Sequence, residues 1–392
     1  MKEVFIVAAK RTPVGGFMGN LSGVTATRLG AIAIKEAYSA AGVLPEQIGE
    51  VYMGNVLSAN VGQSPGRQAA IFGGIPETTD VTTINKVCAS GMKSAMIGAQ
   101  QIQLSLSELV MTGGMESMSN VPHYNYLRKG NKYGDVTLTD GMIKDGLWDV
   151  YNDFHMGRAA ELCARKYKIT RAAQDEYALE SYRRAAAATK AGKFNNEIVL
   201  VLIEQKSGDV LIGEDEDIYK VIPDKVSKLP PAFEDGGTVT AANASNLNDG
   251  AAAILLASRE AIDKYGLKPL ARIVSFADAA QAPEWFTTSP SLAIPKALQL
   301  AGLALSDIDF FEINEAYAAV AIANMELLGL DAAKVNVYGG AIAIGHPLGA
   351  SGARIMCTLL SVLKQEGGRY GVAAICNGGG GASAIVVENL QQ

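Results

Sequence analysis

The sequence has 392 residues, of which 48% are hydrophobic and 19% charged, a composition typical of a globular protein of two or three domains. Its formal net charge of -6 and pI of about 5.3 argue against nucleic acid as the main partner, while a small polyanion can still meet a local basic patch. No apolar run approaches the roughly 18 residues that a membrane span needs. Four widely spaced cysteines without a CxxC pair predict a cytoplasmic location, and only three histidines argue against a metal cluster.

The first part of the chain alternates strand and helix patterns. The apolar run VFIVA at residues 4–8 predicts a strand and not a signal peptide, because basic residues close it after a few positions. Apolar residues three and four apart predict an amphipathic helix over residues 27–40. Further on, the pattern predicts the end of a strand at residues 84–87 and the first turns of a helix at residues 90–96. Cys88 lies at that strand-to-helix junction.

The middle of the chain, residues 119–249, breaks this alternation. It holds an aromatic, glycine-bearing loop, PHYNYLRKGNKYGD, two helical runs over residues 156–168 and 171–191, and the acidic stretch GEDEDIYK. Inserted loops on a rigid scaffold commonly carry binding. We therefore expect a loop domain here.

The last part of the chain repeats the first at an offset near 260. AGLALSDIDFFEINEA, from Ala301, matches AGVLPEQIGEVYMGNV, from Ala41, and each follows an amphipathic helix, here over residues 291–300. The strand-like KVNVYGGAIAI then leads into GHPLGASGARIM, as VTTINKV leads into CASGMKSAM. An apolar strand ending in glycines follows in both, ELVMTGG and YGVAAICNGGGG. We predict two homologous α/β halves, residues 1–118 and 250–392, with mainly parallel sheets.

The repeat places Cys88 and His346 at equivalent junctions, where a pseudo-dyad can bring them face to face across one cleft. An imidazole and a helix N-terminus both favour the thiolate that acts as a nucleophile. Small residues after Cys88 leave room for an acyl group and expose its N–H as an oxyanion donor. The alternatives are a buried, inert cysteine and a core or capping histidine.

Three other positions admit a structural and a functional interpretation. Cys376 precedes NGGGG, which predicts either a turn whose amides point into a cleft or an ordinary β-turn; no GxGxxG spacing supports a nucleotide fold. Asn314 follows a buried strand and could hold a water or a substrate oxygen, but the sequence alone favours a helix cap. His155 begins a helix in the loop domain, where a single histidine is usually structural.

Together these motifs resemble the thiolase family, in particular its acetoacetyl-CoA thiolases. The matching stretches, in chain order, are NKVCASGMKS, GGMESMSN, HMG, GTVTAANASNLNDGAAA, NEAY, GGAIAIGHPLGASGAR and CNGGGGASA. The resemblance covers essentially the whole chain. It implies two similar halves in a five-layered α-β-α-β-α core with a loop domain over the active site.

The resemblance also implies roles for the residues singled out above. Cys88 would be the nucleophile that accepts an acetyl group, His346 its base, and Cys376 the acid and base at the α-carbon or the CoA sulfur. Asn314 would hold a water that forms one oxyanion hole with His346. The backbone N–H groups of Cys88 and Gly378 would form the other.

Contacts to the substrate follow from the same resemblance. His155 would meet the pantetheine arm, and Met156 would keep the acyl pocket short. The pantetheine moiety would also lie near three residues of the loop domain, namely Leu147, Phe233 and Ser245.

The chain departs from the family pattern at several positions. Tyr317 stands where NEAF is usual, which adds a hydroxyl near the acyl pocket. The stretch IYKVIPDKVSKLPPAF aligns poorly; Lys225 is the best candidate for the CoA 3′-phosphate, the alternative being a solvated surface lysine. Tyr219 resembles a tyrosine near the potassium site of some members.

The expected activity is reversible condensation of two acetyl-CoA to acetoacetyl-CoA and CoA, with no required cofactor. The alternatives are a broader-range 3-ketoacyl-CoA thiolase, which Met156 argues against, and a non-catalytic acyl-CoA-binding protein, which should lack Cys88, His346 or Cys376. The resemblance implies a homo-oligomer. The loop at residues 121–135 is similar to a tetramerisation loop, so we expect a tetramer.

Overall fold

The computed structural model describes residues 2–206 and 208–391. Within them, ten strands form one long mixed sheet, in the order β14-β15-β16-β13-β1-β12-β5-β3-β4 with β2 paired to β12. The strands of the first half are β1 (Val4–Arg11), β2 (Gly15–Gly16), β3 (Glu50–Gly54), β4 (Asp80–Ile84), β5 (Leu109–Ser117) and β12 (Asn248–Ser258). Those of the second half are β13 (Ala271–Ala280), β14 (Phe310–Ile313), β15 (Tyr370–Asn377) and β16 (Gly381–Asn389).

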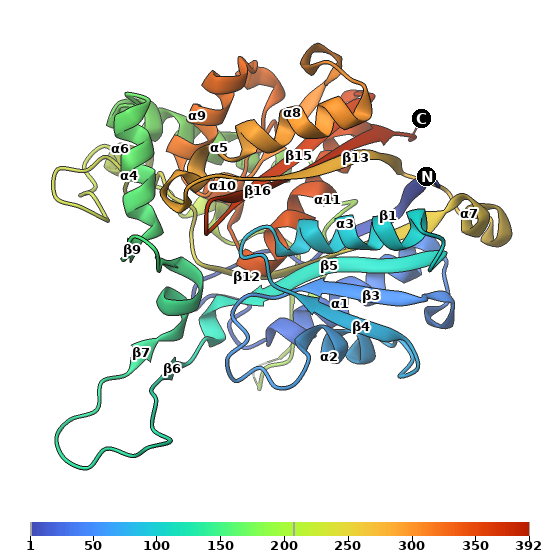
Figure 1. Ribbon diagram of the computed structural model, residues 1–392, viewed down its shortest axis with the longest axis horizontal. Coiled ribbons are helices and arrows are strands. Elements are labelled where there is room, and N and C mark those ends of the chain that lie inside the picture. Colours follow the sequence, from blue (N-terminus) through green and yellow to red (C-terminus); the bar gives the residue numbers. More distant parts are fainter. Residues whose placement is uncertain (1, 207, 392) are drawn as a thin grey trace.

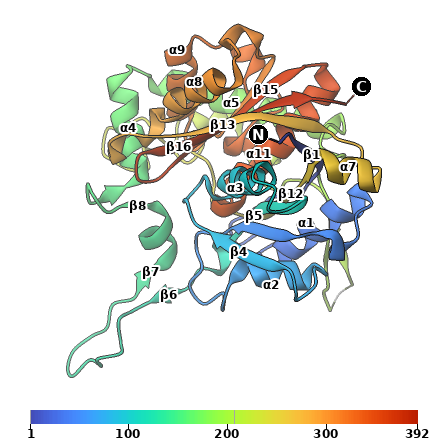
Figure 2. The ribbon, with the colours of Figure 1, turned by 45° about the vertical axis from the view of Figure 1, so that its right-hand side comes forward.

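The two halves meet edge to edge through strands β1 and β13, which pair antiparallel about Phe5 and Arg272. On either side of this pair the strand order is the same, β12-β5-β3 in one half and β16-β15-β14 in the other. The sheet curls so that its two parts face each other across helices α3 and α11 (Figures 1 and 2). The repeat read from the sequence is therefore a real structural duplication.

The expectation of mainly parallel pairing was wrong. Only β3–β4, β3–β5 and β14–β15 are parallel, while the remaining pairs of the long sheet are antiparallel. The reason is visible after β15, where a glycine turn sends the chain straight back as β16. Such a reversal gives an antiparallel pair without the crossover helix that parallel strands need.

Helices complete the five layers. The described helices are α1 (Ala26–Ala41), α2 (Pro65–Phe72), α3 (Ser90–Gln103), α4 (Met156–Lys166), α5 (Arg171–Lys190), α6 (Pro223–Val226), α7 (Arg259–Tyr265), α8 (Pro290–Ala301), α9 (Ala318–Leu328), α10 (Ala341–Ile344) and α11 (Leu348–Glu366). Helix α1 covers the outer face of the first half and α8 that of the second, as their amphipathic patterns predict (Figure 1). The expected α-β-α-β-α arrangement is confirmed.

The central helices α3 and α11 approach each other very closely because small residues face one another. A Cβ added at Gly352 of α11 would lie 2.4 Å from the backbone nitrogen of Met92, and one at Gly91 of α3 would lie 2.9 Å from the carbonyl of Gly349. Any larger residue would push the helices apart. Since Cys88 precedes α3 and His346 precedes α11, this contact brings the two residues into one region.

The strand expected over residues 334–344 is not formed. Val335 makes only an isolated bridge to Phe311, and residues 341–344 form the short helix α10. Gly339, with a φ of 78°, turns the chain before that helix, against the backbone of Ser181 in α5. His346 therefore lies between two helices rather than at a strand-to-helix junction.

The inserted segment carries α4, α5 and α6 and three small hairpins, formed by β6 (His123–Tyr124) with β7 (Thr139–Asp140), β8 (Trp148–Asp149) with β9 (Phe154–His155), and β10 (Val201–Ile203) with β11 (Val210–Ile212). The β6–β7 hairpin projects far from the body of the molecule (Figure 1). Strand β12 lies between β5 and β1, so sheet pairing favours a boundary of the first half after Ser258 rather than at residue 250.

Candidate active site

A cavity of about 340 Å³ opens where the loop domain meets both halves. Cys88 contributes from the first half and His346 from the second. The loop domain contributes most of the apolar wall. Among the residues that line the cavity are Leu147, His155, Met156, Phe233, Ser245 and Tyr317. The structure thus brings together residues that lie up to 258 positions apart in the sequence.

Cys88 lies between β4 and α3, at the predicted strand-to-helix junction, in a tight turn. Val87, just before it, has a φ of 47°, which is rare for a β-branched residue. Ser90 stabilises the turn: its hydroxyl donates to the Val87 carbonyl at 2.6 Å and accepts from the Lys86 N–H at 2.8 Å. Cys88 is 5% exposed. Burial raises the pKa of Cys88 to about 12, and the N–H groups of Gly378 and Cys88 itself act in the opposite direction.

His346 is held at three points. Its backbone N–H donates to Asn248 Oδ1 at 2.8 Å, its Nδ1 lies 2.6 Å from Ser351 Oγ, and its Nε2 lies 3.5 Å from Asn314 Nδ2. Burial and the positive charge of Arg354 lower the pKa of His346 to about 3. The ring is therefore a neutral imidazole at ordinary pH, able to accept a proton.

Asn314 does not cap the following helix, so the capping interpretation was wrong. Helix α9 begins at Ala318, and Tyr317 occupies its N-cap position. Asn314 instead lies at the end of β14, where its N–H donates to the Ala374 carbonyl of β15 at 3.0 Å. Its side chain is 1% exposed, and its Oδ1 has no hydrogen-bond partner within residues 2–206 and 208–391.

Cys376 lies within β15, near its end, and packs in an apolar cluster with Met156 and Tyr317. Burial and the nearby Cys88 raise the pKa of the Cys376 thiol well above its usual value. Two residues further, Gly378 passes between Met156 and Val87: a Cβ there would lie 3.4 Å from the Met156 sulfur. The backbone N–H of Gly378 reaches the Cys88 thiol.

The loop domain adds an aromatic stack at the cavity wall. The His155 ring stacks on Phe233, with centroids 4.8 Å apart, and Phe233 meets Tyr317 edge to face at 6.0 Å. His155 Nδ1 also accepts from the Gly157 N–H at 3.0 Å and so caps α4. His155 therefore caps α4 and also lines the cavity, and its contact with pantetheine stays a prediction.

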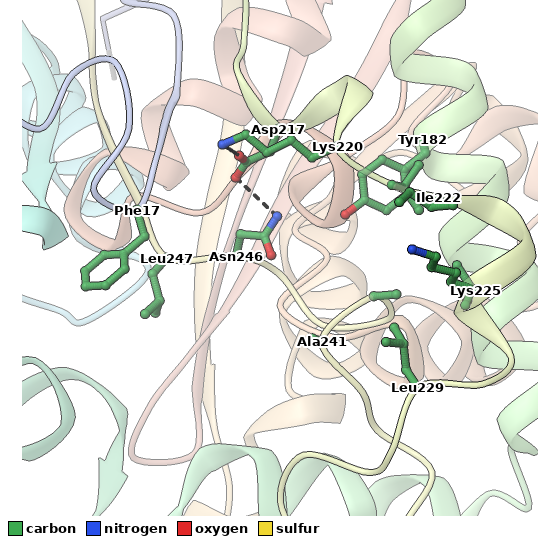
Figure 3. Close-up of a pocket in the computed structure, with 13 residues that line it drawn as sticks. Phe17, Tyr182, Asp217, Lys220, Ile222, Lys225, Leu229, Ala241, Asn246 and Leu247 are labelled. Atoms are coloured by element: carbon green, nitrogen blue, oxygen red, sulfur yellow. Dashed lines mark hydrogen bonds and ion pairs between the residues drawn. The ribbon is translucent and has the colours of Figure 1, made fainter.

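A second cavity, of about 520 Å³, adjoins the first and shares Ala241, Asn246 and Leu247 with it. Figure 3 shows Lys225 of α6 at its side, near Tyr182 and Leu229. Its ammonium group has no ion pair within the described residues, unlike Lys220, which pairs with Asp217 at 2.8 Å. Lys225 is thus available for an anionic ligand.

Tyr219, the residue that the resemblance places near a potassium site, lies at the surface, and the potassium site stays a prediction. Its side chain is 60% exposed and does not line the cavity, although its neighbours Asp217 and Lys220 do. No group of three or more His, Cys, Asp or Glu side chains that could hold a metal occurs in the described chain.

Three positioning residues were missed by the sequence analysis: Ser351, Asn248 and Glu116. The Glu116 carboxylate is fully buried and accepts from Asn55 Nδ2 at 2.7 Å and from three backbone N–H groups, including that of Gly349 at 2.9 Å. It thereby ties β5 to the first turn of α11. All three residues lie inside motifs quoted above. Asn248 and Glu116 reach His346 and Gly349 only once the two halves dock, whereas Ser351 reaches His346 within its own segment.

Comparison with known proteins agrees with this architecture. Residues 4–260 match the family description "Thiolase, N-terminal domain", and residues 267–389 match "Thiolase, C-terminal domain". The chain therefore belongs to the thiolase family. The junction of the two matches, between residues 260 and 267, lies in the link from β12 to β13.

Similar proteins resemble the chain over its whole length. It is 56% identical to acetyl-CoA acetyltransferase 2 of Arabidopsis thaliana, covering 99% of this chain and 98% of that protein. Identity is 54% to the cytosolic acetyl-CoA acetyltransferase ERG10 of Gibberella zeae (100% and 99% covered) and 52% to the mitochondrial acetyl-CoA acetyltransferase of Bos taurus (100% and 92%). The crystal structure of Acat5 thiolase from Ascaris suum with coenzyme A superposes with a TM-score of 0.95, at 46% identity, over 99% and 100% of the two chains.

Proposed function

We propose that this thiolase is an acetyl-CoA C-acetyltransferase, which condenses two acetyl-CoA to acetoacetyl-CoA and CoA and runs the reverse thiolysis. The observation that carries the proposal is that Cys88 and His346 line one cavity from the two halves. The buried Cys376 and the Gly378 N–H lie near Cys88, and Asn314 lies beside His346. The similar proteins named acetyl-CoA acetyltransferase support the substrate.

In the first half-reaction the Cys88 sulfur attacks the thioester carbonyl while its proton moves to His346 Nε2. The negative charge on the carbonyl oxygen is stabilised by the Cys88 and Gly378 N–H groups. The carbon–sulfur bond to CoA then breaks, and Cys376 protonates the leaving sulfur. The products are acetyl-Cys88 and CoA. Imidazolium and Cys376 thiolate form together, so the buried site gains no net charge.

In the second half-reaction the Cys376 thiolate removes a proton from the methyl group of another acetyl-CoA. The enolate oxygen is stabilised by His346 and by a water on Asn314, whose free Oδ1 supports this role. The carbanion attacks the acetyl-Cys88 carbonyl, and Cys88 leaves and recovers its proton from His346. These three side chains balance every proton, so the mechanism needs no metal or organic cofactor.

CoA would extend from Cys88 through the first cavity into the second. His155, Leu147, Phe233 and Ser245 would meet the pantetheine arm, since they line the inner cavity. Lys225 would then meet the 3′-phosphate, because it lies at the outer cavity without an ion pair among the described residues.

The test is the CoA-dependent loss of acetoacetyl-CoA absorbance, followed with wild-type protein and with Cys88→Ala. We expect turnover by the wild type and only background in the variant. Absence of turnover would favour a non-catalytic acyl-CoA-binding protein. Equal rates on acetoacetyl-CoA and 3-ketohexanoyl-CoA would favour a broader-range thiolase. We do not expect this result, because Met156 in the cavity wall limits the space for a longer acyl chain.

We further propose a homotetramer in the cytoplasm. The projecting β6–β7 hairpin supports the assembly, because Tyr126 and Tyr133 on it are 96% and 98% exposed. Four free cysteines support a reducing compartment, and no described helix could cross a membrane. Light scattering that gives a dimeric mass, or fractionation that finds the protein in an organelle, would contradict these two proposals.

A further inference from the structure

Two lysines of the first half converge on one aspartate of the second. Lys86 Nζ lies 2.5 Å and Lys93 Nζ 2.7 Å from the two oxygens of Asp278. Ser383 completes the group: its hydroxyl lies 2.6 Å from Asp278 and 2.9 Å from Lys86 Nζ. We call these four residues the inter-half clamp.

The clamp is attached next to both cysteines. On one side, Lys86 is two residues before Cys88, in the same tight turn, and Lys93 lies on α3. On the other, Ser383 of β16 pairs in register with Ile375, the neighbour of Cys376. Asp278 of β13 pairs in register with Ser383 from the opposite side. The clamp thus joins the backbone that carries Cys88 to the sheet that carries Cys376.

We propose that the inter-half clamp positions Cys376 relative to Cys88, and that it serves carbon–carbon bond formation more than acetyl transfer. This inference rests on the function proposed above. Its members are positioning residues, because their side chains bond one another and act through the two segments that carry the cysteines.

The two half-reactions differ in what they require of the cysteine pair. Acetyl transfer needs Cys88 beside His346, a relationship held separately by the α3–α11 contact and by Glu116. CoA is a good leaving group, so this step depends less on the acid. Bond formation instead needs Cys376 beside the methyl group that attacks acetyl-Cys88. A displacement of about 1 Å can then cost up to 100-fold in rate.

A purely stabilising role is the alternative, and the exposure of the clamp argues against it. Its charged side chains are 25–35% exposed, and ion pairs that water reaches contribute little to stability. Loss of the clamp should therefore leave the fold nearly unchanged while the second half-reaction slows. If the clamp only stabilised the fold, its loss would slow both half-reactions by the same factor.

The experiment uses the full-length protein with Lys86→Met, Asp278→Asn and both combined. Single-turnover mass spectrometry gives the rate of Cys88 acetylation by acetyl-CoA, and a coupled assay gives the rate of condensation. We expect condensation to fall by about tenfold and acetylation to stay within about twofold. The double variant should match Asp278→Asn, because both changes remove the same link.

Lys2→Met is the control, since Lys2 pairs with Glu260 on the surface at 2.8 Å, and neither half-reaction should change. Ser383→Ala, a minimal change, tests the clamp if a charge variant does not fold, with the same expected split. Equal slowing of both half-reactions, or no slowing of either, would overturn the inference. No acetylation of Cys88 in the wild type would instead overturn the proposed function.

Discussion

The hydroxyl of Ser351 lies 2.6 Å from Nδ1 of His346, one turn into α11. The same hydroxyl lies 2.8 Å from the Pro347 carbonyl, which can only accept. Ser351 therefore gives its single proton to Pro347 and accepts the Nδ1–H of the imidazole. This arrangement selects the tautomer whose lone pair is on Nε2, facing Asn314 and the cavity.

Replacing Ser351 by alanine should slow catalysis without abolishing it. The Nδ1–H would lose its acceptor, and the imidazole would populate the wrong tautomer and other orientations. We expect kcat to fall by about tenfold, the value of one hydrogen bond of roughly 1.4 kcal/mol. Ser361→Ala is the matched control, because it removes another buried hydroxyl of the same helix, one that bonds Glu197. Equal kcat values for the two variants would contradict the orienting role.

The buried His346 should make the protein acid-sensitive. Its folded pKa of about 3 lies below the ordinary 6.5, so between these values the unfolded chain binds one more proton than the folded chain. The free energy of unfolding should therefore fall as the pH drops through this window, by up to about 1.4 kcal/mol per pH unit from this group. Above pH 6.5 the ring is neutral in both the folded and the unfolded chain, so His346 then lowers the free energy of unfolding no further.

The corresponding measurement is urea unfolding of wild type and His346→Gln from pH 7 to pH 4. The variant lacks the titrating ring, so its free energy of unfolding should depend less steeply on pH. The difference between the two proteins should shrink on acidification. Two parallel curves over this range would show that His346 does not titrate as its burial requires.

Lys225→Ala should weaken binding of CoA through its 3′-phosphate. We expect KM for CoA in thiolysis to rise by about tenfold, since a charged hydrogen bond contributes roughly 1.5–3 kcal/mol, part of which solvent screens. KM for 3′-dephospho-CoA should stay the same. Lys228→Ala provides the control, because this nearby lysine does not line the cavity. If KM rose for both CoA and 3′-dephospho-CoA, Lys225 would contact a part of CoA other than the 3′-phosphate.

Met156→Ala should lengthen the accepted acyl chain. The Met156 side chain is 8% exposed and lies against both Cys376 and Gly378, so truncation opens space beside the acyl group. We expect the ratio of kcat/KM on 3-ketohexanoyl-CoA to that on acetoacetyl-CoA to increase by about tenfold or more. The ratio cancels differences in the fraction of folded enzyme. An unchanged ratio would show that another residue limits chain length.

Local patterns in the sequence determined much of this protein. The amphipathic periods over residues 27–40 and 291–300 give α1 and α8 nearly to the residue, because one face of each helix must be buried. The repeat revealed the duplication, and the strand and helix patterns on either side of Cys88 predicted its junction before α3. These features depend on residues that are close together in the sequence, so the sequence alone is enough to predict them.

Only the tertiary structure decided which distant segments meet. Strand β12 joins the first half and not the second, and residues 334–344 form α10 and a bridge instead of a strand. The contacts of Asn248 with His346, of Glu116 with Gly349 and of Lys86 with Asp278 likewise depend on how the halves dock. The physical reason is that a hydrogen bond between distant segments depends on how elements far apart in the sequence pack, as α3 and α11 do through their glycine faces. No local period in the sequence records that contact.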